Sequence, residues 1–132
     1  MPEDQLVQAA QKAQQAAYAP YSNYRVGAAL RAKSGKVYLG ANIENAAYPD
    51  SICAERVAMF SAIMEGERDF DAIAVVTRDG GSPCGSCRQV LAEFALHTQV
   101  ILANQAGEVL QKTTVDALLP GAFLPSNLNI KP

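Results

Sequence analysis

Three cysteines in two separate groups constrain the fold of this chain more than any other feature. Cys53 begins a Cys-Ala-Glu segment, and Cys84 and Cys87 are the cysteines of a Pro-Cys-Gly-Ser-Cys segment further along the chain. Three thiolates are the number that a catalytic zinc site uses, because the tetrahedral ion then keeps its fourth position for a water molecule. A fold that uses them in this way must bring two distant segments to one point.

Both cysteine groups fall at the starts of predicted helices, at about residues 53–65 and 86–96. The positive end of each helix would then lie beside the thiolates and lower their pKa values. The two cysteines of the second group can face the same point in a first helical turn. Side chains at i and i+2 diverge in a regular helix, so Cys53 should be the N-cap if it and Glu55 are to reach one ion.

Glu55 lies two residues after the first cysteine, where its carboxylate can move protons instead of binding the ion. A cysteine ligand, a glutamate two residues later and a Pro-Cys-x-x-Cys segment form the pattern of zinc-dependent base deaminases, in which the glutamate is the general acid and base. We therefore expect Glu55 to take a proton from the zinc-bound water and pass it to a ring nitrogen of an aminopyrimidine. It would then return a proton to the departing ammonia.

The charge of such a site needs compensation. Zn²⁺ with three thiolates carries a net negative charge, which opposes ionisation of the bound water. Arg56 and Arg88 each directly follow one of the cysteine segments. We expect at least one of these arginines to donate hydrogen bonds to a thiolate sulfur, a role in the second shell of the metal. The alternative is that both are ordinary surface charges.

Composition predicts a single globular domain, residues 1–132. A length of 132 residues is enough for one core and too short for two domains. Apolar residues make up 49% and charged residues 18%, as is usual for a globular fold and unlike disorder. The net charge of −2 gives no electrostatic footprint for nucleic acid or for an anionic membrane surface. Neither a membrane-spanning apolar run nor a signal peptide is recognisable. An odd number of cysteines indicates reduced thiols, so we expect a cytoplasmic protein.

The order of predicted elements is a helix, two strands, and then helices that alternate with strands. The first helix is expected to be capped by Asp4 and to end before Pro20, with an apolar stripe of Leu6, Ala10, Ala13 and Ala17. Strands are expected at residues 24–32, 37–41, 72–76, 100–103 and 108–111. The side chains available for burial in the two later helices are Val57, Phe60, Ile63 and Met64, and Val90, Leu91, Phe94 and Ala95. This order predicts an α/β fold, a three-layer α/β/α sandwich with a mixed sheet of about five strands, antiparallel at the first hairpin and parallel elsewhere.

Six motifs spread over nearly the whole chain are shared with one known family. They are Tyr-Ala-Pro-Tyr-Ser at 18–22, Val-Gly-Ala-Ala at 26–29, Asn-Ile-Glu-Asn-Ala-Ala-Tyr at 42–48, Cys-Ala-Glu-Arg at 53–56, Pro-Cys-Gly-Ser-Cys-Arg-Gln-Val at 83–90 and Leu-Leu-Pro-Gly-Ala-Phe at 118–123. By these motifs the chain resembles the small cytidine deaminases, homotetrameric zinc enzymes of pyrimidine salvage. The resemblance implies that Cys53, Cys84 and Cys87 bind one zinc ion per chain and that Glu55 is the proton shuttle.

The resemblance also implies residues that bind the substrate. Asn42 and Glu44 would bind the ribose, chiefly its 3′-hydroxyl, and the N–H of Ala54 would meet the 2-carbonyl oxygen of the base. An amide and a carboxylate are good partners for sugar hydroxyls, and alternation points both to one side of an extended segment. Tyr24, where the family often has Phe, would stack on the base. Phe123 would stack on the base of a neighbouring subunit; without the resemblance, it could equally be a core residue.

Two positions depart from the pattern of this family. Tyr24 adds a hydroxyl that needs a hydrogen-bond partner, and Ile52 stands where a polar residue commonly precedes the first cysteine. Neither position is expected to touch the zinc chemistry.

The leading prediction is hydrolytic deamination of cytidine and 2′-deoxycytidine to the uridines with release of ammonia. The alternatives are a deaminase of another aminopyrimidine such as a blasticidin-type antibiotic, an editor of polynucleotide bases, a structural zinc module, and a thiol redox pair of Cys84 and Cys87. The Asn42-x-Glu44 pair favours a ribose, and the negative net charge disfavours a polynucleotide. His97, the only histidine, is expected to be a solvated residue near a helix end.

Overall fold

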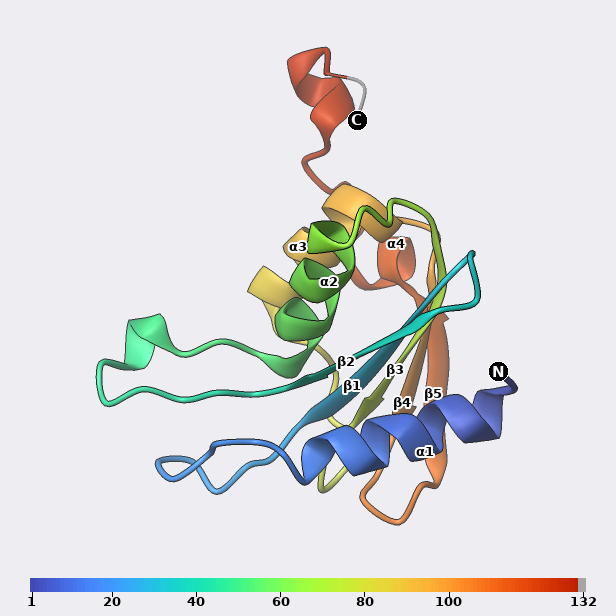
Figure 1. Ribbon diagram of the computed structural model, residues 1–132. Helices are drawn as coiled ribbons and strands as arrows, with labels where there is room; N and C mark the ends of the chain where they lie inside the picture. Colours follow the sequence, from blue (N-terminus) through green and yellow to red (C-terminus); the bar gives the residue numbers. More distant parts are fainter. Residues whose placement is uncertain (131–132) are drawn as a thin grey trace.

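Five strands form one sheet between two layers of helices in the computed structural model, which describes residues 1–130 (Figure 1). The order across the sheet is β2-β1-β3-β4-β5. The strands are β1 Gly27–Ala32, β2 Val37–Ala41, β3 Phe70–Val76, β4 Gln99–Ala103 and β5 Val109–Thr114. The helices are α1 Glu3–Gln14, α2 Ala54–Met64, α3 Gly85–Ala95 and α4 Val115–Leu118, with 3₁₀ turns at Tyr48–Asp50 and Pro125–Leu128. The expected α/β/α sandwich with a mixed sheet is confirmed; residues 131 and 132 of the expected domain lie outside the described residues.

The direction of the strands differs from the expectation. Within residues 1–130, β3 and β4 are the one parallel pair; β1 is antiparallel to both β2 and β3, and β5 is antiparallel to β4. The prediction of parallel pairing beyond the first hairpin is therefore confirmed for β3 and β4 and wrong for the pairs β1–β3 and β4–β5. The α2 crossover does leave β2 and β3 running the same way, but β1 lies between them. A short turn joins β4 to β5, and such a turn permits only an antiparallel pair.

The two faces of the sheet are covered by different helices. On one face, Leu6 and Ala10 of α1 pack with Ile101 of β4. On the other face, Met59 of α2 and Leu91 of α3 belong to a separate core cluster. Because successive side chains of a strand point to opposite faces, β1, β3 and β4 each contribute buried residues to both clusters. The helices α2 and α3 therefore share one face of the sheet, and each follows a cysteine segment.

Helix α2 buries its small side chains and exposes two of its large ones. Ala58 and Ala62 are fully buried, whereas Phe60 is 42% exposed and Met64 is 86% exposed, so the expected burial of these two residues is wrong. The helix lies so close to β2 that a Cβ atom at Gly40 would be 2.2 Å from a carbonyl oxygen in the first turn of α2. Only small side chains fit into such an approach, and Phe60 and Met64 are turned outward.

Helix α1 differs from the expectation at both ends. Its N-cap is Pro2, without a side-chain cap bond, and Asp4 lies within the first turn, so the expected Asp4 cap is wrong. The fixed φ of a proline already suits the start of a helix. The helix ends at Gln14, short of the expected stripe residue Ala17. The chain cannot continue as a helix through Tyr18, because the N–H of Tyr18 donates to the carbonyl of Asn42 in the segment after β2.

The C-terminal segment after α4 extends away from the sheet (Figure 1). No helix in residues 1–130 combines the length and the apolar character needed to cross a lipid bilayer.

Candidate metal centre and substrate pocket

The three cysteine sulfurs converge at one point, although they come from separate segments. Cys53 Sγ lies 3.8 Å from Cys84 Sγ, and Cys84 Sγ lies 3.4 Å from Cys87 Sγ. All three sulfurs are within 4.8 Å of one another, and no other His, Cys, Asp or Glu of residues 1–130 joins the group. A tetrahedral ion with Zn–S bonds of about 2.3 Å would hold its sulfurs about 3.8 Å apart. The three thiols therefore fit a zinc ion.

Helix starts produce this convergence. Cys53 is the N-cap of α2 and Cys84 is the N-cap of α3, both with extended backbone, while Cys87 lies in the first turn of α3. The expectation that Cys53 caps its helix is confirmed. The first N–H groups of a helix have no intrahelical acceptor, so the positive ends of both helices meet at the three sulfurs.

The thiols differ in their tendency to ionise. The hydrogen bond from the Cys87 thiol, followed by that from Arg56, lowers the pKa of Cys53 to about 5, although burial opposes the change. The same pairing with Cys53, together with burial, raises the pKa of Cys87. The cluster thus holds a thiolate at neutral pH, which is the form that binds a metal cation.

The two arginines that follow the cysteine segments have different partners. Arg56 Nη2 lies 3.4 Å from Cys53 Sγ, and Arg56 Nε is buried without a hydrogen-bond partner. Arg88 instead donates to the Pro83 carbonyl at 2.8 Å, to the Leu118 carbonyl at 2.7 Å and to Ser82 Oγ at 2.9 Å. Of the two arginines, the structure sets Arg56 against a thiolate and uses Arg88 to join the loop before Cys84 to the end of α4.

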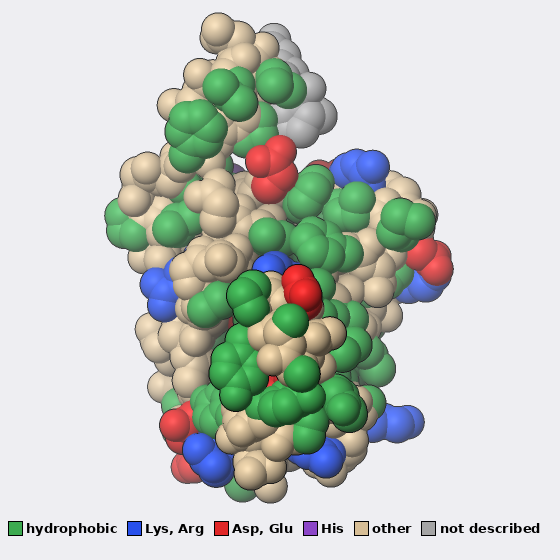
Figure 2. All heavy atoms as spheres, turned by 90° about the vertical axis from the view of Figure 1, so that its left-hand side faces the viewer, with side chains coloured by type: hydrophobic (Ala, Val, Ile, Leu, Met, Phe, Trp, Pro, Cys, Tyr) green, Lys and Arg blue, Asp and Glu red, His purple; other side chains and the backbone are tan. Residues whose placement is uncertain are grey.

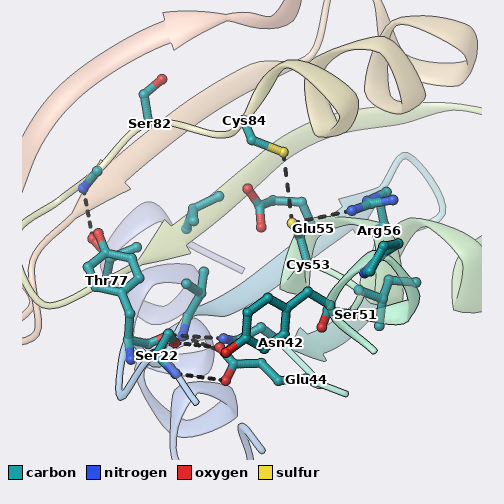
Figure 3. A pocket seen from close by; sticks show the side chains of 17 residues that line it. Ser22, Asn42, Glu44, Ser51, Cys53, Glu55, Arg56, Thr77, Ser82 and Cys84 are labelled. Atoms are coloured by element: carbon teal, nitrogen blue, oxygen red, sulfur yellow. Dashed lines mark hydrogen bonds between the residues drawn. The ribbon is translucent and has the colours of Figure 1, made fainter. Parts of the chain in front are cut away.

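Glu55 lies in the first turn of α2, with only 4% of its surface exposed. Its carboxylate points into the pocket beside Cys53 (Figure 3). Burial, with a smaller contribution from the charge of Cys53, raises the pKa of Glu55 to about 7. A carboxyl group with this pKa can both accept and return a proton near neutral pH.

The pocket beside the thiols has a volume of about 480 Å³ and is formed by segments within 22–26, 42–56 and 77–84 together with Val75 of β3. Four of the expected substrate-binding and catalytic residues line it, namely Tyr24, Asn42, Glu44 and Glu55. Ala54, the first residue of α2, lies between two lining residues and is fully buried. A volume of this size suits a small molecule such as a nucleoside.

Asn42 and Glu44 hold the loop that forms one wall of the pocket. Asn42 Oδ1 accepts from the N–H of Val26 at 2.9 Å, and Asn42 Nδ2 donates to the carbonyl of Tyr24 at 2.9 Å. These bonds occupy the backbone of residues 24–26, so β1 begins at Gly27 and not at residue 24 as expected.

Glu44 is fixed by three donors from the same wall. It accepts from the backbone N–H groups of Tyr21 and Ser22, each at 3.1 Å, and from the Ser22 hydroxyl. The hydrogen bond from the Ser22 hydroxyl, with those from the backbone, lowers the pKa of Glu44 below its ordinary value. An ionised carboxylate with free lone pairs therefore faces the pocket.

Tyr24 and Phe123, the two expected aromatic walls, have different environments. The Tyr24 hydroxyl finds the partner that it needs in Asp79, with Oη 2.6 Å from Oδ1. Phe123 is 59% exposed and lies outside the pocket lining, so the alternative that it is a core residue is wrong. Its carbonyl accepts a hydrogen bond from Gln89 of α3 at 2.8 Å.

Other residues near the site were not singled out by sequence reasoning. Ser22 fixes Glu44, and Thr77, Asp79 and Gly81 form a cluster around the Tyr24 hydroxyl. The one sequence signal for this cluster is the extra hydroxyl of Tyr24. His97, by contrast, is solvated as expected, with its side chain 83% exposed and 3.4 Å from Asp116.

Comparison with known proteins agrees with this geometry. The model of the cytidine and deoxycytidylate deaminase zinc-binding region matches residues 2–103. The cytidine deaminase of Halalkalibacterium halodurans is 50% identical over 132 aligned residues, which cover 98% of this chain and 99% of that protein. The cytidine deaminase of Sporosarcina psychrophila is 49% identical over 129 residues, which cover 96% of this chain and 94% of that protein.

More distant and structural relatives are consistent with the same family. A blasticidin-S deaminase of Bacillus cereus is 32% identical over 109 residues, covering 75% of this chain and 76% of that protein. The crystal structure of a cytidine deaminase from Burkholderia pseudomallei superimposes with a TM-score of 0.89 at 48% sequence identity, covering 93% of this chain and 100% of that one. The chain thus belongs to the cytidine and deoxycytidylate deaminase family.

Proposed function

We propose that this protein catalyses the hydrolytic deamination of cytidine and 2′-deoxycytidine to uridine and 2′-deoxyuridine with release of ammonia, as a cytoplasmic enzyme of pyrimidine salvage. The observation that carries the proposal is the pocket in which three converging thiols, a buried Glu55 and the Asn42–Glu44 pair meet. The whole length, residues 1–132, would act as one catalytic domain.

Cys53, Cys84 and Cys87 would hold one Zn²⁺ per chain. When bound, the ion would supply a Lewis acid that lowers the pKa of a water molecule to about 7. Arg56, 3.4 Å from Cys53 Sγ, would offset part of the thiolate charge in the second shell of the metal. Arg88 would act in that shell indirectly, because it holds the loop that leads into Cys84.

Glu55 would move the protons of the reaction. It takes one proton from the attacking water and delivers it to N3 of the base, while the hydroxyl oxygen bonds to C4. It then carries the remaining hydroxyl proton to the amino group, the C4–N bond breaks, and ammonia leaves as the carbonyl forms. Burial suits Glu55 to this role because it raises the pKa of the carboxyl group to about 7, so the protonated and ionised forms have similar free energies near neutral pH.

Substrate recognition would use the opposite part of the pocket. Asn42 keeps one amide proton and Glu44 keeps free lone pairs after their internal hydrogen bonds, and both would bind the 3′-hydroxyl of the ribose. The N–H of Ala54, at the start of α2, would donate to the 2-carbonyl oxygen of the base. The ring of Tyr24 would pack against the base.

Self-association would complete the site, and we infer a homotetramer. Large apolar side chains remain exposed in the single chain: Tyr21, Ile43, Tyr48, Phe60, Met64, Phe123 and Leu128. Figure 2 shows hydrophobic side chains gathered on the face that carries the pocket loops and on the projecting C-terminal segment. Exposed apolar surface of this extent marks an interface. Phe123, on that segment, would reach the active site of a neighbouring subunit.

The competing substrate class is an aminopyrimidine antibiotic of the blasticidin type, which a relative at 32% identity is named for. The deamination of the aminopyrimidine ring, with the metal held by the three cysteines and protons moved by Glu55, would be the same for both substrates. The fixed Asn42–Glu44 pair favours the ribose, because the two side chains present a donor and an acceptor that are matched to a sugar hydroxyl.

The test is an absorbance assay of cytidine deamination on the zinc-loaded protein, with ammonia measured in parallel. Wild-type protein should release ammonia from cytidine, and Glu55→Ala should keep zinc and fold while losing at least about 10³-fold in kcat. Chelation of zinc should abolish the activity, and zinc should restore it. A wild-type protein that deaminates blasticidin S but not cytidine would establish the competing substrate instead.

A further inference from the structure

A hydrogen-bonded cluster connects Tyr24 with the loop that precedes Cys84. The Tyr24 hydroxyl donates to Asp79 Oδ1 at 2.6 Å. Thr77 Oγ1 lies 3.3 Å from the same oxygen and accepts from the N–H of Gly81 at 2.7 Å (Figure 3). Tyr24, Thr77 and Gly81 line the pocket, whereas Asp79 is exposed and does not line it. The hydrogen bond from Tyr24 lowers the pKa of Asp79, so the acceptor is ionised at neutral pH.

The rest of Tyr24 is held as well. Its N–H donates to Ser22 Oγ at 3.0 Å, and its carbonyl accepts from Asn42 Nδ2 at 2.9 Å. The guanidinium carbon of Arg78, which does not line the pocket, lies 5.3 Å from the centre of the tyrosine ring. With the backbone fixed on both sides, the freedom that remains is rotation of the ring, and the bond to Asp79 restricts that rotation.

Gly81 leaves the space that the hydroxyl occupies. A Cβ atom at Gly81 would lie 2.7 Å from Tyr24 Oη, closer than a Cβ atom approaches any oxygen, and 3.5 Å from Asp79 Oδ1. An alanine there would therefore push the tyrosine ring away and strain its bond to Asp79. If residue 24 were phenylalanine, the nearest neighbour would be the carboxylate at 3.5 Å, an ordinary contact. The hydroxyl, Asp79 and Gly81 are thus a matched set.

We propose that Asp79 and Gly81 are positioning residues for the nucleoside: together they hold the hydroxyl of Tyr24, fix its ring as a wall of the pocket, and so raise affinity for the substrate. The inference rests on the proposed function. Neither residue is within the thiol cluster, and neither carries a proton of the reaction. Their loss therefore weakens binding, which raises KM, and leaves the chemical step nearly unchanged.

The first test is a double-mutant cycle on zinc-loaded protein with cytidine as substrate. Asp79→Ala should raise KM about fivefold and change kcat less than about twofold, because it removes one hydrogen bond to a charged acceptor. Asp79→Asn keeps an accepting oxygen and should restore KM to near the wild-type value. In a Tyr24→Phe background, Asp79→Ala should have no further effect. Asp71→Asn, an aspartate of β3 paired with Arg31 outside the pocket, is the matched control and should leave KM unchanged.

The second test leaves Asp79 in place, so it is decisive even where Asp79→Ala does not fold. Gly81→Ala should raise KM about fivefold beside Tyr24 and be almost neutral beside Tyr24→Phe. Equal effects of Gly81→Ala in the two backgrounds, or a fall in kcat at constant KM in Asp79→Ala, would overturn the positioning role while cytidine turnover by the wild type stands. A wild-type protein without cytidine turnover would overturn the proposed function, and this inference with it.

Discussion

The pocket has two sides that are held in place by different interactions. On the helix side, Cys53, Glu55 and Cys84 are carried by the N-termini of α2 and α3, whose apolar faces lie in the core of the sheet. On the loop side, Tyr24 and Glu44 lie on irregular segments that are held by hydrogen bonds between side chains and backbone. The helix side is thus anchored by hydrophobic packing, and the loop side by individual polar contacts. Changes on the first should affect the metal and kcat, and changes on the second should affect KM.

The largest effect is expected from removing a sulfur on the helix side. Cys84→Ala should abolish retention of zinc and lower cytidine turnover by more than about 10³-fold, because only two of the three protein ligands of the ion would remain. The fold should survive, since Cys84 is exposed and contributes nothing to the core. Metal content, kcat and circular dichroism of the purified variant provide the measurement.

Ser86→Ala is the control for this change, because Ser86 is an exposed neighbour in α3 that is outside the sulfur group. A Cys84→Ala protein that still held one zinc ion per chain and turned over cytidine would contradict the three-sulfur site.

A second effect on the helix side is the cost of burying Glu55. Its pKa rises from 4.5 to about 7 on folding, so between these values the folded state binds more protons than the unfolded state. Stability therefore falls as pH rises from 4.5 to 7, and the full cost is present above pH 7. Zinc-free Glu55→Gln should be more stable than zinc-free wild type by about 3 kcal/mol at pH 8, with the gain nearly vanishing by pH 4.5.

Urea unfolding of both zinc-free proteins at pH 4.5, 6 and 8, under reducing conditions, measures this difference. Glu93→Gln, at an exposed position of α3, reports the effect of the same change outside the pocket. A gain in stability that is the same at all three pH values would show that the charge of Glu55 is not its cause.

Each helix start of the helix side was predictable from the sequence because its geometry is local. A cysteine at the N-cap, a glutamate in the first turn and a Cys-x-x-Cys at the next helix start all act within one helical turn, so their spacing predicts the arrangement. The meeting of the two starts is not local, since Cys53 and Cys84 are 31 positions apart, and it was expected only because a zinc site needs three sulfurs at one point. The pairing of strands is not local. The alternation of helices and strands predicts a crossover between β2 and β3, but it does not predict that β1 lies between them.

The two arginines allow a comparison within the helix side. Arg56→Gln should lower turnover about tenfold and shift the pH–rate profile to higher pH, because the donor to the Cys53 thiolate is lost. Arg88→Gln removes bonds to two carbonyl groups and should lower stability by about 1–2 kcal/mol, with the profile at its original pH. The pH dependence of kcat and the thermal midpoint of both zinc-loaded variants separate the roles. Profiles identical to wild type in both variants would remove the proposed charge compensation.

The loop side was less predictable. Asn42 and Glu44 were expected only through the resemblance to a family, and their hydrogen bonds to the loop were not expected. The partners of the loop residues are far away in the sequence: Ser22 and Glu44 are 22 positions apart, and Tyr24 and Asp79 are 55 positions apart. Bonds of this kind have no periodicity that a sequence pattern could reveal. The tertiary structure alone brings these groups together.

The smallest effect is expected from a single bond of the loop side. Ser22→Ala removes the hydroxyl that donates to Glu44 and accepts from the N–H of Tyr24, but leaves the two backbone donors to Glu44 in place. The lost hydrogen bond contributes about 1 kcal/mol to substrate binding by orienting Glu44. Its loss should raise the KM for cytidine about threefold to fivefold at constant kcat. Ser34→Ala breaks a similar Ser–Glu bond, to Glu67, away from the pocket and should change neither constant. If Ser22→Ala lowered kcat at constant KM, the loop side would take part in the chemical step. The assignment of kcat to the helix side and of KM to the loop side would then be wrong.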